Sequence, residues 1–152
     1  MEEKYQLLNQ QLVSLLEGEK NTISILSNVS ALLNETLKDI NWVGFYLYDT
    51  ESGELTLGPF QGKVACMHIP MNKGVCGSAA YQRKTLRVDD VHCFEGHIAC
   101  DSASNSEIVI PIIVNEEVFG VLDIDSPLFS RFDEVDQKYL EQFVKILQEV
   151  LS

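Results

Sequence analysis

The sequence SEIVIPIIVNEEVFGVLDID (residues 106–125) contains two apolar runs, 106–114 and 118–125, joined by three polar residues. Both runs are rich in β-branched residues, and the short polar join predicts that they pair as a hairpin. Side chains alternate between the two faces of a strand. Asp123 and Asp125 therefore share one face of the second run, and the aliphatic residues between them point to the other.

Strand signals continue upstream of this hairpin, and helical patterns occupy both ends of the chain. We expect strands at 42–48, 54–58, 67–70 and 85–88, and a short helix at 74–82. Leucines at helical spacing predict an N-terminal helix, then a second helix capped by Asn21. Asp133 caps a C-terminal helix with one apolar stripe. This order predicts an α+β fold, with a central, mostly antiparallel sheet and the N- and C-terminal helices packed on one face, in a single domain 1–152.

Composition and charge exclude several classes of function. The 152 residues carry 11 basic and 23 acidic side chains, a net charge of -12, which repels nucleic acid and anionic membrane surfaces. No apolar run is long enough to cross a membrane, and the acidic, polar N-terminus does not resemble a secretory signal. We therefore expect a cytoplasmic protein with no nucleic-acid or membrane partner. Gly74–Gly77 lacks the length and the Lys-Ser/Thr of a phosphate-binding loop.

Four cysteines are present: Cys66, Cys76, Cys93 and Cys100. In a reducing compartment, reactive or metal-binding thiols are more common than structural disulfides. Two thiols that meet in space can cycle through a disulfide. Polar, glycine-containing surroundings predict accessible thiols, although each cysteine could instead be a small core residue.

Acidic and aromatic side chains offer a second set of candidates. Glu107 opens the first run of the hairpin and could lie opposite Asp123 and Asp125. Such a trio could hold an ammonium group and donate a proton, because like-charged neighbours raise a carboxyl pKa; the alternative is a solvated sheet edge. The aromatic residues of 42–48 could wall a small pocket or simply belong to the core. They are Trp42, Phe45, Tyr46 and Tyr48.

A zinc site is a further alternative. The region 89–105 is polar and without a clear period, which is often a sign of a functional segment. It holds a stretch with four potential ligands, although their spacing matches no usual zinc signature. The ligands are His92, Cys93, His97 and Cys100.

Three stretches together, 57–80, 88–112 and 120–126, resemble the free methionine-(R)-sulfoxide reductases, which are stand-alone GAF-domain enzymes. Nine residues separate Cys66 from Cys76, and twenty-three separate Cys76 from Cys100. This three-cysteine pattern is specific to that family, because most GAF domains lack it. The resemblance implies a GAF fold and the thiol-dependent reduction of free methionine-(R)-sulfoxide. The alternative is a GAF module that senses a small molecule without chemistry.

The resemblance also implies a role for each matching residue. Cys100 matches the catalytic cysteine, Cys66 the partner that closes a disulfide on it, and Cys76 an auxiliary thiol. The acids that match substrate binding and proton delivery are Glu107, Asp123 and Asp125, and Trp42 and Tyr46 fall where pocket aromatics lie. The resemblance implies no cofactor or metal. It does imply a thioredoxin-like protein as the reductant and a homodimer as the assembly. Cys93 is an extra thiol, and Glu95 replaces a usual proline.

Overall fold

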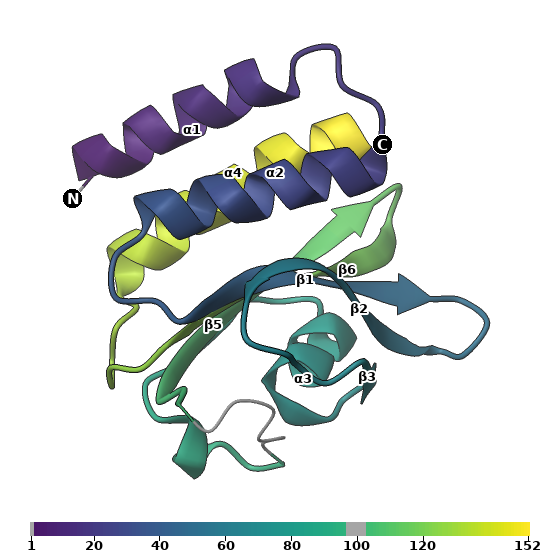
Figure 1. The fold of residues 1–152 in the computed structure, drawn as a ribbon. Coiled ribbons are helices and arrows are strands. Elements are labelled where there is room, and N and C mark those ends of the chain that lie inside the picture. Colours follow the sequence, from purple (N-terminus) through teal and green to yellow (C-terminus); the bar gives the residue numbers. More distant parts are fainter. Residues whose placement is uncertain (1, 97–102) are drawn as a thin grey trace.

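The computed structural model describes residues 2–96 and 103–152. Among these residues, six strands form one sheet in the order β3-β2-β1-β6-β5-β4, and every neighbouring pair is antiparallel (Figure 1). The strands are β1 (Trp42–Asp49), β2 (Glu54–Gly62), β3 (His68–Pro70), β4 (Leu86–Val88), β5 (Ser106–Val114) and β6 (Glu117–Ser126). The predicted α+β class with an antiparallel sheet is confirmed.

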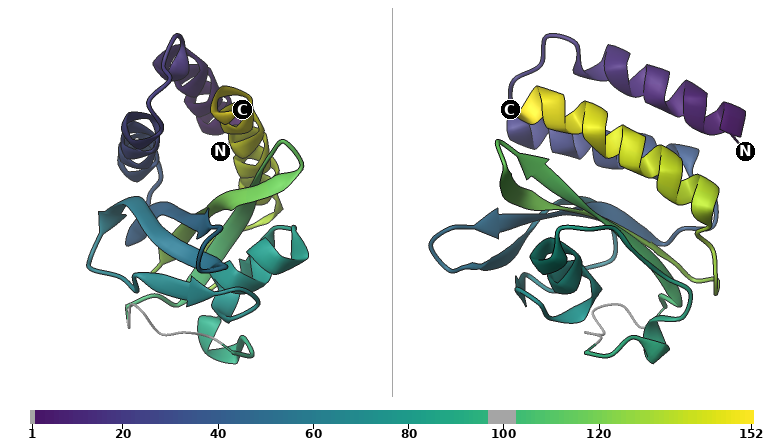
Figure 2. Two further views of the ribbon diagram at one scale, coloured as in Figure 1. Left: turned by 90° about the vertical axis from the view of Figure 1, so that its right-hand side faces the viewer. Right: turned by 180° about the vertical axis from the view of Figure 1, so that it is seen from behind.

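In the described part of the chain, three α-helices cover one face of this sheet and one α-helix lies on the other (Figure 2). They are α1 (Glu2–Leu16), α2 (Thr22–Thr36) and α4 (Glu134–Leu151) on the first face, and α3 (Gly74–Gln82) on the second. The helix starts follow the predicted caps: the Asn21 side chain accepts from Ser24 N, and Asp133 forms a capping box with Asp136. α2 packs on β1 and β2, and α4 packs on β5. α1 packs on α4 and α2, so it forms an outer layer.

The β5–β6 hairpin has a tighter turn than the sequence suggested. Only Asn115 and Glu116 join the strands, and both have positive φ, of 52° and 68°. A two-residue turn with positive φ at both positions matches the right-handed twist of the paired strands. The turn sets the pairing as far as Ile113 and Val118; a bulge between Ile112 and Ile113 then shifts the register by one residue and places Glu107 opposite Asp125.

Strand β2 is longer than predicted, because Gly58 and Pro59 resemble a strand end in the sequence. The β1–β2 pairing shifts register between Gly44, which pairs with Phe60, and Tyr46, which pairs with Leu57, so Gly58 and Pro59 of β2 lie in a bulge. A bulge tolerates proline because the missing N–H is not needed for the ladder. β2 therefore continues to Gly62 and places Phe60 on the face of α3.

The sheet separates two apolar clusters. The larger one joins the helices α1, α2 and α4 to aliphatic residues such as Ile108, Leu122 and Ile124. The smaller one lies between the sheet and α3 and includes Trp42 and Tyr46. Strand alternation assigns each side chain to one cluster or the other, so the acids of β6 share the face of α3.

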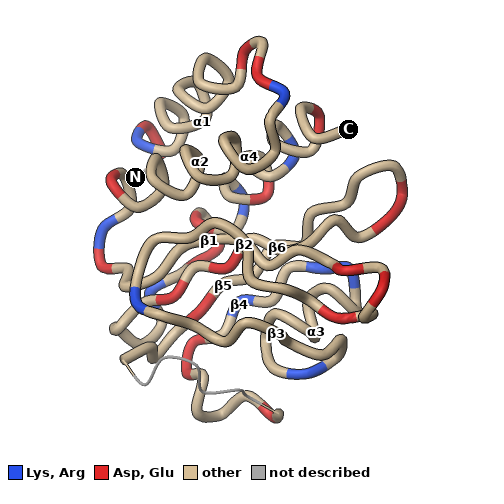
Figure 3. The backbone as a smooth tube through the Cα atoms, turned by 45° about the vertical axis from the view of Figure 1, so that its right-hand side comes forward, with Lys and Arg blue, Asp and Glu red and all other residues tan. Residues whose placement is uncertain are grey.

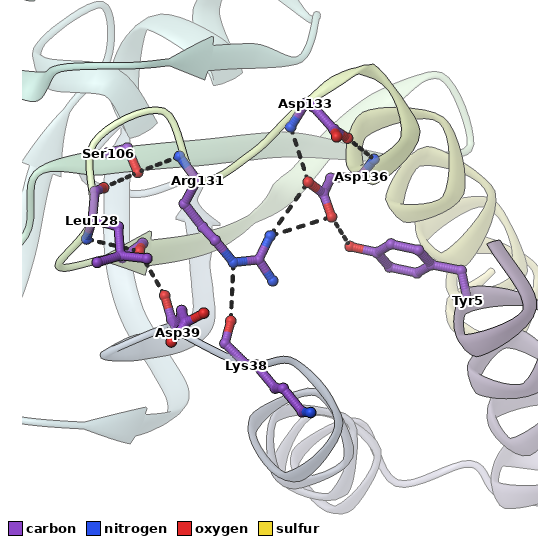
Figure 4. A network of polar contacts seen from close by, with 9 residues as sticks. Tyr5, Lys38, Asp39, Ser106, Leu128, Arg131, Asp133 and Asp136 are labelled. Carbon is purple, nitrogen blue, oxygen red and sulfur yellow. Dashed lines mark hydrogen bonds and ion pairs between the residues drawn. The ribbon is translucent and has the colours of Figure 1, made fainter. Parts of the chain in front are cut away.

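A buried polar network joins the ends of the helical layer to the sheet (Figure 4). The Asp136 carboxylate is 1% exposed; it accepts a hydrogen bond from Tyr5 Oη at 2.5 Å and lies 3.3 Å from Arg131 Nη1. Arg131 Nε donates to the carbonyl of Lys38 at 2.9 Å, beyond the end of α2. One buried carboxylate thus connects α1, α4 and the segment that enters β1.

Candidate active site

Three acids lie side by side on the α3 face of the sheet. Glu107 on β5 pairs with Asp125 on β6, which in turn pairs with Trp42 on β1, and Asp123 lies two residues before Asp125. Their exposed fractions are 8% for Glu107, 5% for Asp123 and 9% for Asp125. The alternative of a solvated sheet edge is wrong, because β5 and β6 are inner strands and α3 covers them.

Cys76 reaches these acids from the first turn of α3. Its Sγ lies 3.9 Å from Glu107 Oε2, at the long limit for a hydrogen bond to sulfur. α3 approaches the sheet closely because Gly77 has no side chain: a Cβ there would lie 2.3 Å from the carbonyl oxygen of Pro70. Cys76 is 5% exposed, so the expectation of an accessible thiol is wrong for this residue. It holds for Cys93, which is exposed.

Burial and mutual repulsion raise the pKa values of Glu107, Asp123 and Cys76. Burial raises the pKa of Glu107 well above its ordinary value, and the charge of Asp123 raises it further. Burial and then the charge of Asp125 raise the pKa of Asp123 in the same way. The Cys76 thiol has a raised pKa because it is buried beside Asp123 and Glu107. The cluster therefore holds protons at pH values where ordinary carboxyl groups have lost them.

Aromatic side chains form the wall beside the acids. The rings of Trp42 and Tyr46 stack with centroids 5.9 Å apart, and the ring of Phe60 from β2 stacks with Trp42 at 5.1 Å. The expectation that Phe45 lines the same pocket is wrong, because strand alternation turns it into the core on the helix side. Tyr48 is partly buried on the α3 face.

The segment that carries Cys66 is tied to this aromatic wall. Tyr46 Oη donates to the carbonyl of Cys66 at 2.9 Å, and Cys66 is half-buried against the α3-side cluster. Cys66 is disulfide-bonded, whereas Cys76 and Cys93 carry free thiols. Cys100, the partner that we expect for Cys66, lies outside the described residues.

The residues that could hold a metal differ from those that the sequence suggested. One ligand atom each from Cys76, Glu107 and Asp123 lies within 4.8 Å of the others, which is compatible with a cation. Of the stretch considered for zinc, His97 and Cys100 lie outside the described residues. His92 Nδ1 lies 2.9 Å from Asp90 Oδ1, and Cys93 Sγ donates to Asp90 Oδ2 at 3.5 Å.

Two residues at the site were missed by the sequence reasoning. Phe60 completes the aromatic stack, and strand alternation would have revealed it had β2 been extended past Pro59. Asn41 precedes β1; its backbone N–H donates to the carbonyl of Asp125 at 2.9 Å, and its Nδ2 donates to Ser104 Oγ at 3.2 Å. It links the end of the acidic strand to the segment that leads into β5, and no sequence pattern marks it.

Comparison with known proteins places this chain in a family. Residues 21–152 match the GAF domain. The free methionine-R-sulfoxide reductase of Escherichia coli is 51% identical over 150 residues, covering 99% of this chain and 90% of that protein. The structure of the reduced form of fRMsr of Staphylococcus aureus is 56% identical with a TM-score of 0.94, covering 97% of this chain and 95% of that one.

The free methionine-R-sulfoxide reductase of Neisseria meningitidis, solved in complex with its substrate, is 44% identical with a TM-score of 0.94, covering 97% and 87% of the two chains. No helix in the described part of this chain is both long and apolar enough to cross a membrane. The match to the GAF domain and the full-length identity to these relatives lead to one conclusion: the chain has the GAF fold and belongs to the free methionine-R-sulfoxide reductase family.

Proposed function

We propose that this protein reduces free methionine-(R)-sulfoxide to methionine in the cytoplasm, as the names of its relatives indicate for them. The observation that carries the proposal is the buried contact between Cys76, Glu107 and Asp123, in which carboxyl pKa values are raised. Reduction of a sulfoxide needs a proton for the departing oxygen. A carboxyl group whose pKa is raised by burial and by its acidic neighbours supplies it.

The same cluster suits a free amino acid as the substrate. Carboxyl oxygens at 107, 123 and 125 accept hydrogen bonds from an ammonium group, which a residue inside a peptide lacks, and the ionised member of the cluster adds a negative charge. Trp42 and Tyr46 offer aromatic faces to the apolar part of the side chain. We propose that backbone N–H groups of the region 89–105 or of a helix start donate hydrogen bonds to the substrate carboxylate.

The chemical step begins at Cys100. Its thiolate attacks the sulfoxide sulfur, and a carboxyl of the acidic cluster protonates the oxygen. The hydroxyl then moves from the methionine sulfur to Cys100 Sγ as the transient bond between the two sulfurs breaks, so methionine leaves and Cys100 becomes a sulfenic acid. Cys66 condenses with that sulfenic acid, releases water and forms a disulfide. A thioredoxin-type dithiol then reduces the disulfide. The disulfide-bonded state of Cys66 supports this cycle.

Cys76 acts in this proposal as an auxiliary group. Its thiol stays protonated because burial and the neighbouring acids raise its pKa, so it is a poor nucleophile. Its contact with Glu107 holds that carboxyl against the sheet. Cys93 is exposed and lies beside Asp90, which raises the pKa of its thiol, so it takes no part in the cycle.

Turnover of the two epimers of free methionine sulfoxide tests the activity directly. With dithiothreitol as the reductant, we expect loss of the R epimer and no change in the S epimer. Cys93→Ser serves as the matched control and should retain full activity. If the purified protein leaves both epimers unchanged, the enzyme assignment fails and a ligand-sensing GAF module takes its place.

The roles of the two cysteines are separated by a single turnover without reductant. Cys100→Ser should release no methionine, because the attacking sulfur is gone. Cys66→Ser should still release about one methionine per chain and then stop, because the sulfenic acid forms but no disulfide closes. Quantifying methionine per chain by mass spectrometry decides this, and a Cys66→Ser protein without that burst reassigns the disulfide partner.

A further inference from the structure

The loop that carries Cys66 exposes two large apolar side chains, one on each side of the cysteine. Val64 is 89% exposed and Met67 is 70% exposed, while Cys66 between them is half-buried and disulfide-bonded. Single exposed apolar residues are common on protein surfaces. Two that flank a redox-capable sulfur form a surface which any protein approaching that sulfur must contact.

Hydrogen bonds from the sheet hold this loop in place at three backbone carbonyls. Trp42 Nε1 donates to Lys63 O at 3.1 Å, and Tyr46 Oη donates to Cys66 O at 2.9 Å. The backbone N–H of Leu57 donates to Met67 O at 2.9 Å. The main chain is fixed against the aromatic wall, so the apolar side chains project outward from a surface that needs little ordering on binding.

The charge of this region differs from that of the rest of the protein. From Leu55 to Val88 the sequence contains no Asp or Glu, yet it holds five of the eleven basic residues of a chain whose net charge is -12. They are Lys63, Lys73, Arg83, Lys84 and Arg87. Figure 3 shows blue and no red on the tube between β2 and α3. Of the five basic residues only Lys63 belongs to the Lys63–Met67 loop, and Arg87 lies on β4 at the opposite edge of the sheet. A thiolate that approaches the loop meets the positive charge of Lys63, and Glu54 lies 3.5 Å from His68, one residue beyond Met67.

We propose that the surface of Lys63–Met67 is the docking site for a thioredoxin-type dithiol protein; this rests on the proposed function. One thiolate of that protein attacks Cys66 Sγ, forms a mixed disulfide and expels the partner sulfur of Cys66 as a thiolate. The second thiol of the reductant then attacks the reductant's first sulfur, which is bonded to Cys66, and releases Cys66 as a thiolate. Two electrons pass from the dithiol to the disulfide, and the reductant leaves oxidised.

Two reductants distinguish docking from chemistry. Dithiothreitol is small and needs no docking surface, whereas thioredoxin does. In the double variant Val64→Asp/Met67→Asp, we expect kcat/KM for thioredoxin to fall about tenfold or more, with dithiothreitol-supported turnover unchanged. Ile23→Asp is the control: this side chain is 71% exposed on α2, in the helical layer, and its replacement should change neither rate.

Unchanged thioredoxin kinetics in the double variant would overturn the docking site, as would an equal loss with both reductants. A change in oligomeric state on gel filtration would also overturn it, because the loop would then contact a second copy of the chain. Absence of turnover with dithiothreitol in the unmodified protein would instead overturn the proposed function.

A trapping experiment tests the attacked sulfur without any sulfoxide. Thioredoxin that lacks its second cysteine should form a stable mixed disulfide with the oxidised protein, and peptide mapping should place the bond at Cys66. The double variant should trap more slowly by the same factor. A mixed disulfide at another cysteine contradicts the proposal.

Discussion

Asp123 shows how a single residue can oppose folding while it serves the site. It is 5% exposed, and its Oδ1 has no hydrogen-bond partner among the described residues. Its folded-state pKa is raised, so the folded protein binds this proton more tightly than the unfolded chain does. Stability is therefore lost as pH rises above the ordinary value of 3.8 and toward the folded-state pKa.

We expect Asp123→Asn to be more stable than the unmodified protein at pH 8 and to turn over sulfoxide more slowly. The gain should shrink as pH falls toward 4 and should vanish below the ordinary pKa of 3.8, where the unmodified carboxyl is protonated in both states. For a chain of this length, each 1 kcal/mol corresponds to about 3–4 °C in Tm. Thermal unfolding at both pH values checks this, with the exposed Glu51→Gln as a control that should change nothing. A lower Tm for Asp123→Asn at pH 8 would contradict it.

At the level of elements, the position of α3 depends on the absence of a side chain at Gly77. A Cβ there would lie 2.3 Å from the carbonyl oxygen of Pro70, so Gly77→Ala must displace the helix or the strand end. We expect a loss of about 1–3 kcal/mol in stability, as for overpacked cores. Because Cys76 is the neighbouring residue, sulfoxide turnover should fall as well. Ser78→Ala, in the same helix turn, is the control, and equal losses in both variants would sink the argument.

The capping box of α4 gives a pH-dependent prediction. Asp133 accepts from Asp136 N at 3.0 Å, and this hydrogen bond holds the pKa of Asp133 below its usual value. The cap therefore stabilises the fold above pH 3.8 and is lost as pH falls through the lower folded-state pKa. Asp133→Ala should cost about 1 kcal/mol at pH 7 and less near pH 3. Asp133→Asn keeps an acceptor, so chemical denaturation should show a smaller loss at pH 7.

The sequence predicted these elements well where pattern and local chemistry agree. The caps at Asn21 and Asp133, the β5–β6 hairpin and the short helix at 74–82 are confirmed. The extension of β2 past Pro59 was missed because the bulge depends on the pairing with β1. In the sequence alone, Gly58 and Pro59 resemble the end of a strand.

The candidate site was predictable in its residue types but not in its burial. Alternation placed Asp123 and Asp125 on one face, and the hairpin register added Glu107. That these acids and Cys76 are covered depends on α3 crossing the sheet, a long-range contact that no local pattern encodes. The Cys76 thiol was expected to be accessible because its local sequence does not show that α3 packs on the sheet.

On the scale of the whole molecule, Arg131 and Asp136 join the helical layer to the sheet. Asp136 is 1% exposed, so removing its charged partner leaves a buried carboxylate with only neutral donors. We expect Arg131→Met to cost about 3 kcal/mol or more. Tyr5→Phe removes one neutral donor from the same carboxylate and should cost about 1 kcal/mol. Denaturant unfolding of the two variants tests this order, and equal costs would contradict it.

The alternation along β6 has a consequence for how this protein can change over evolution. Leu122 and Ile124 pack in the apolar cluster under α1, α2 and α4, while Asp123 and Asp125 point to the α3 face and belong to the candidate site. Inserting or deleting one residue within the paired part of this strand would turn the carboxylates into the larger apolar cluster and the aliphatic side chains into the acidic site. Catalytic failure and misfolding would then occur together, so β6 tolerates a change of length only where a bulge absorbs it, as the bulge opposite Ile112 and Ile113 absorbs one extra residue of β6.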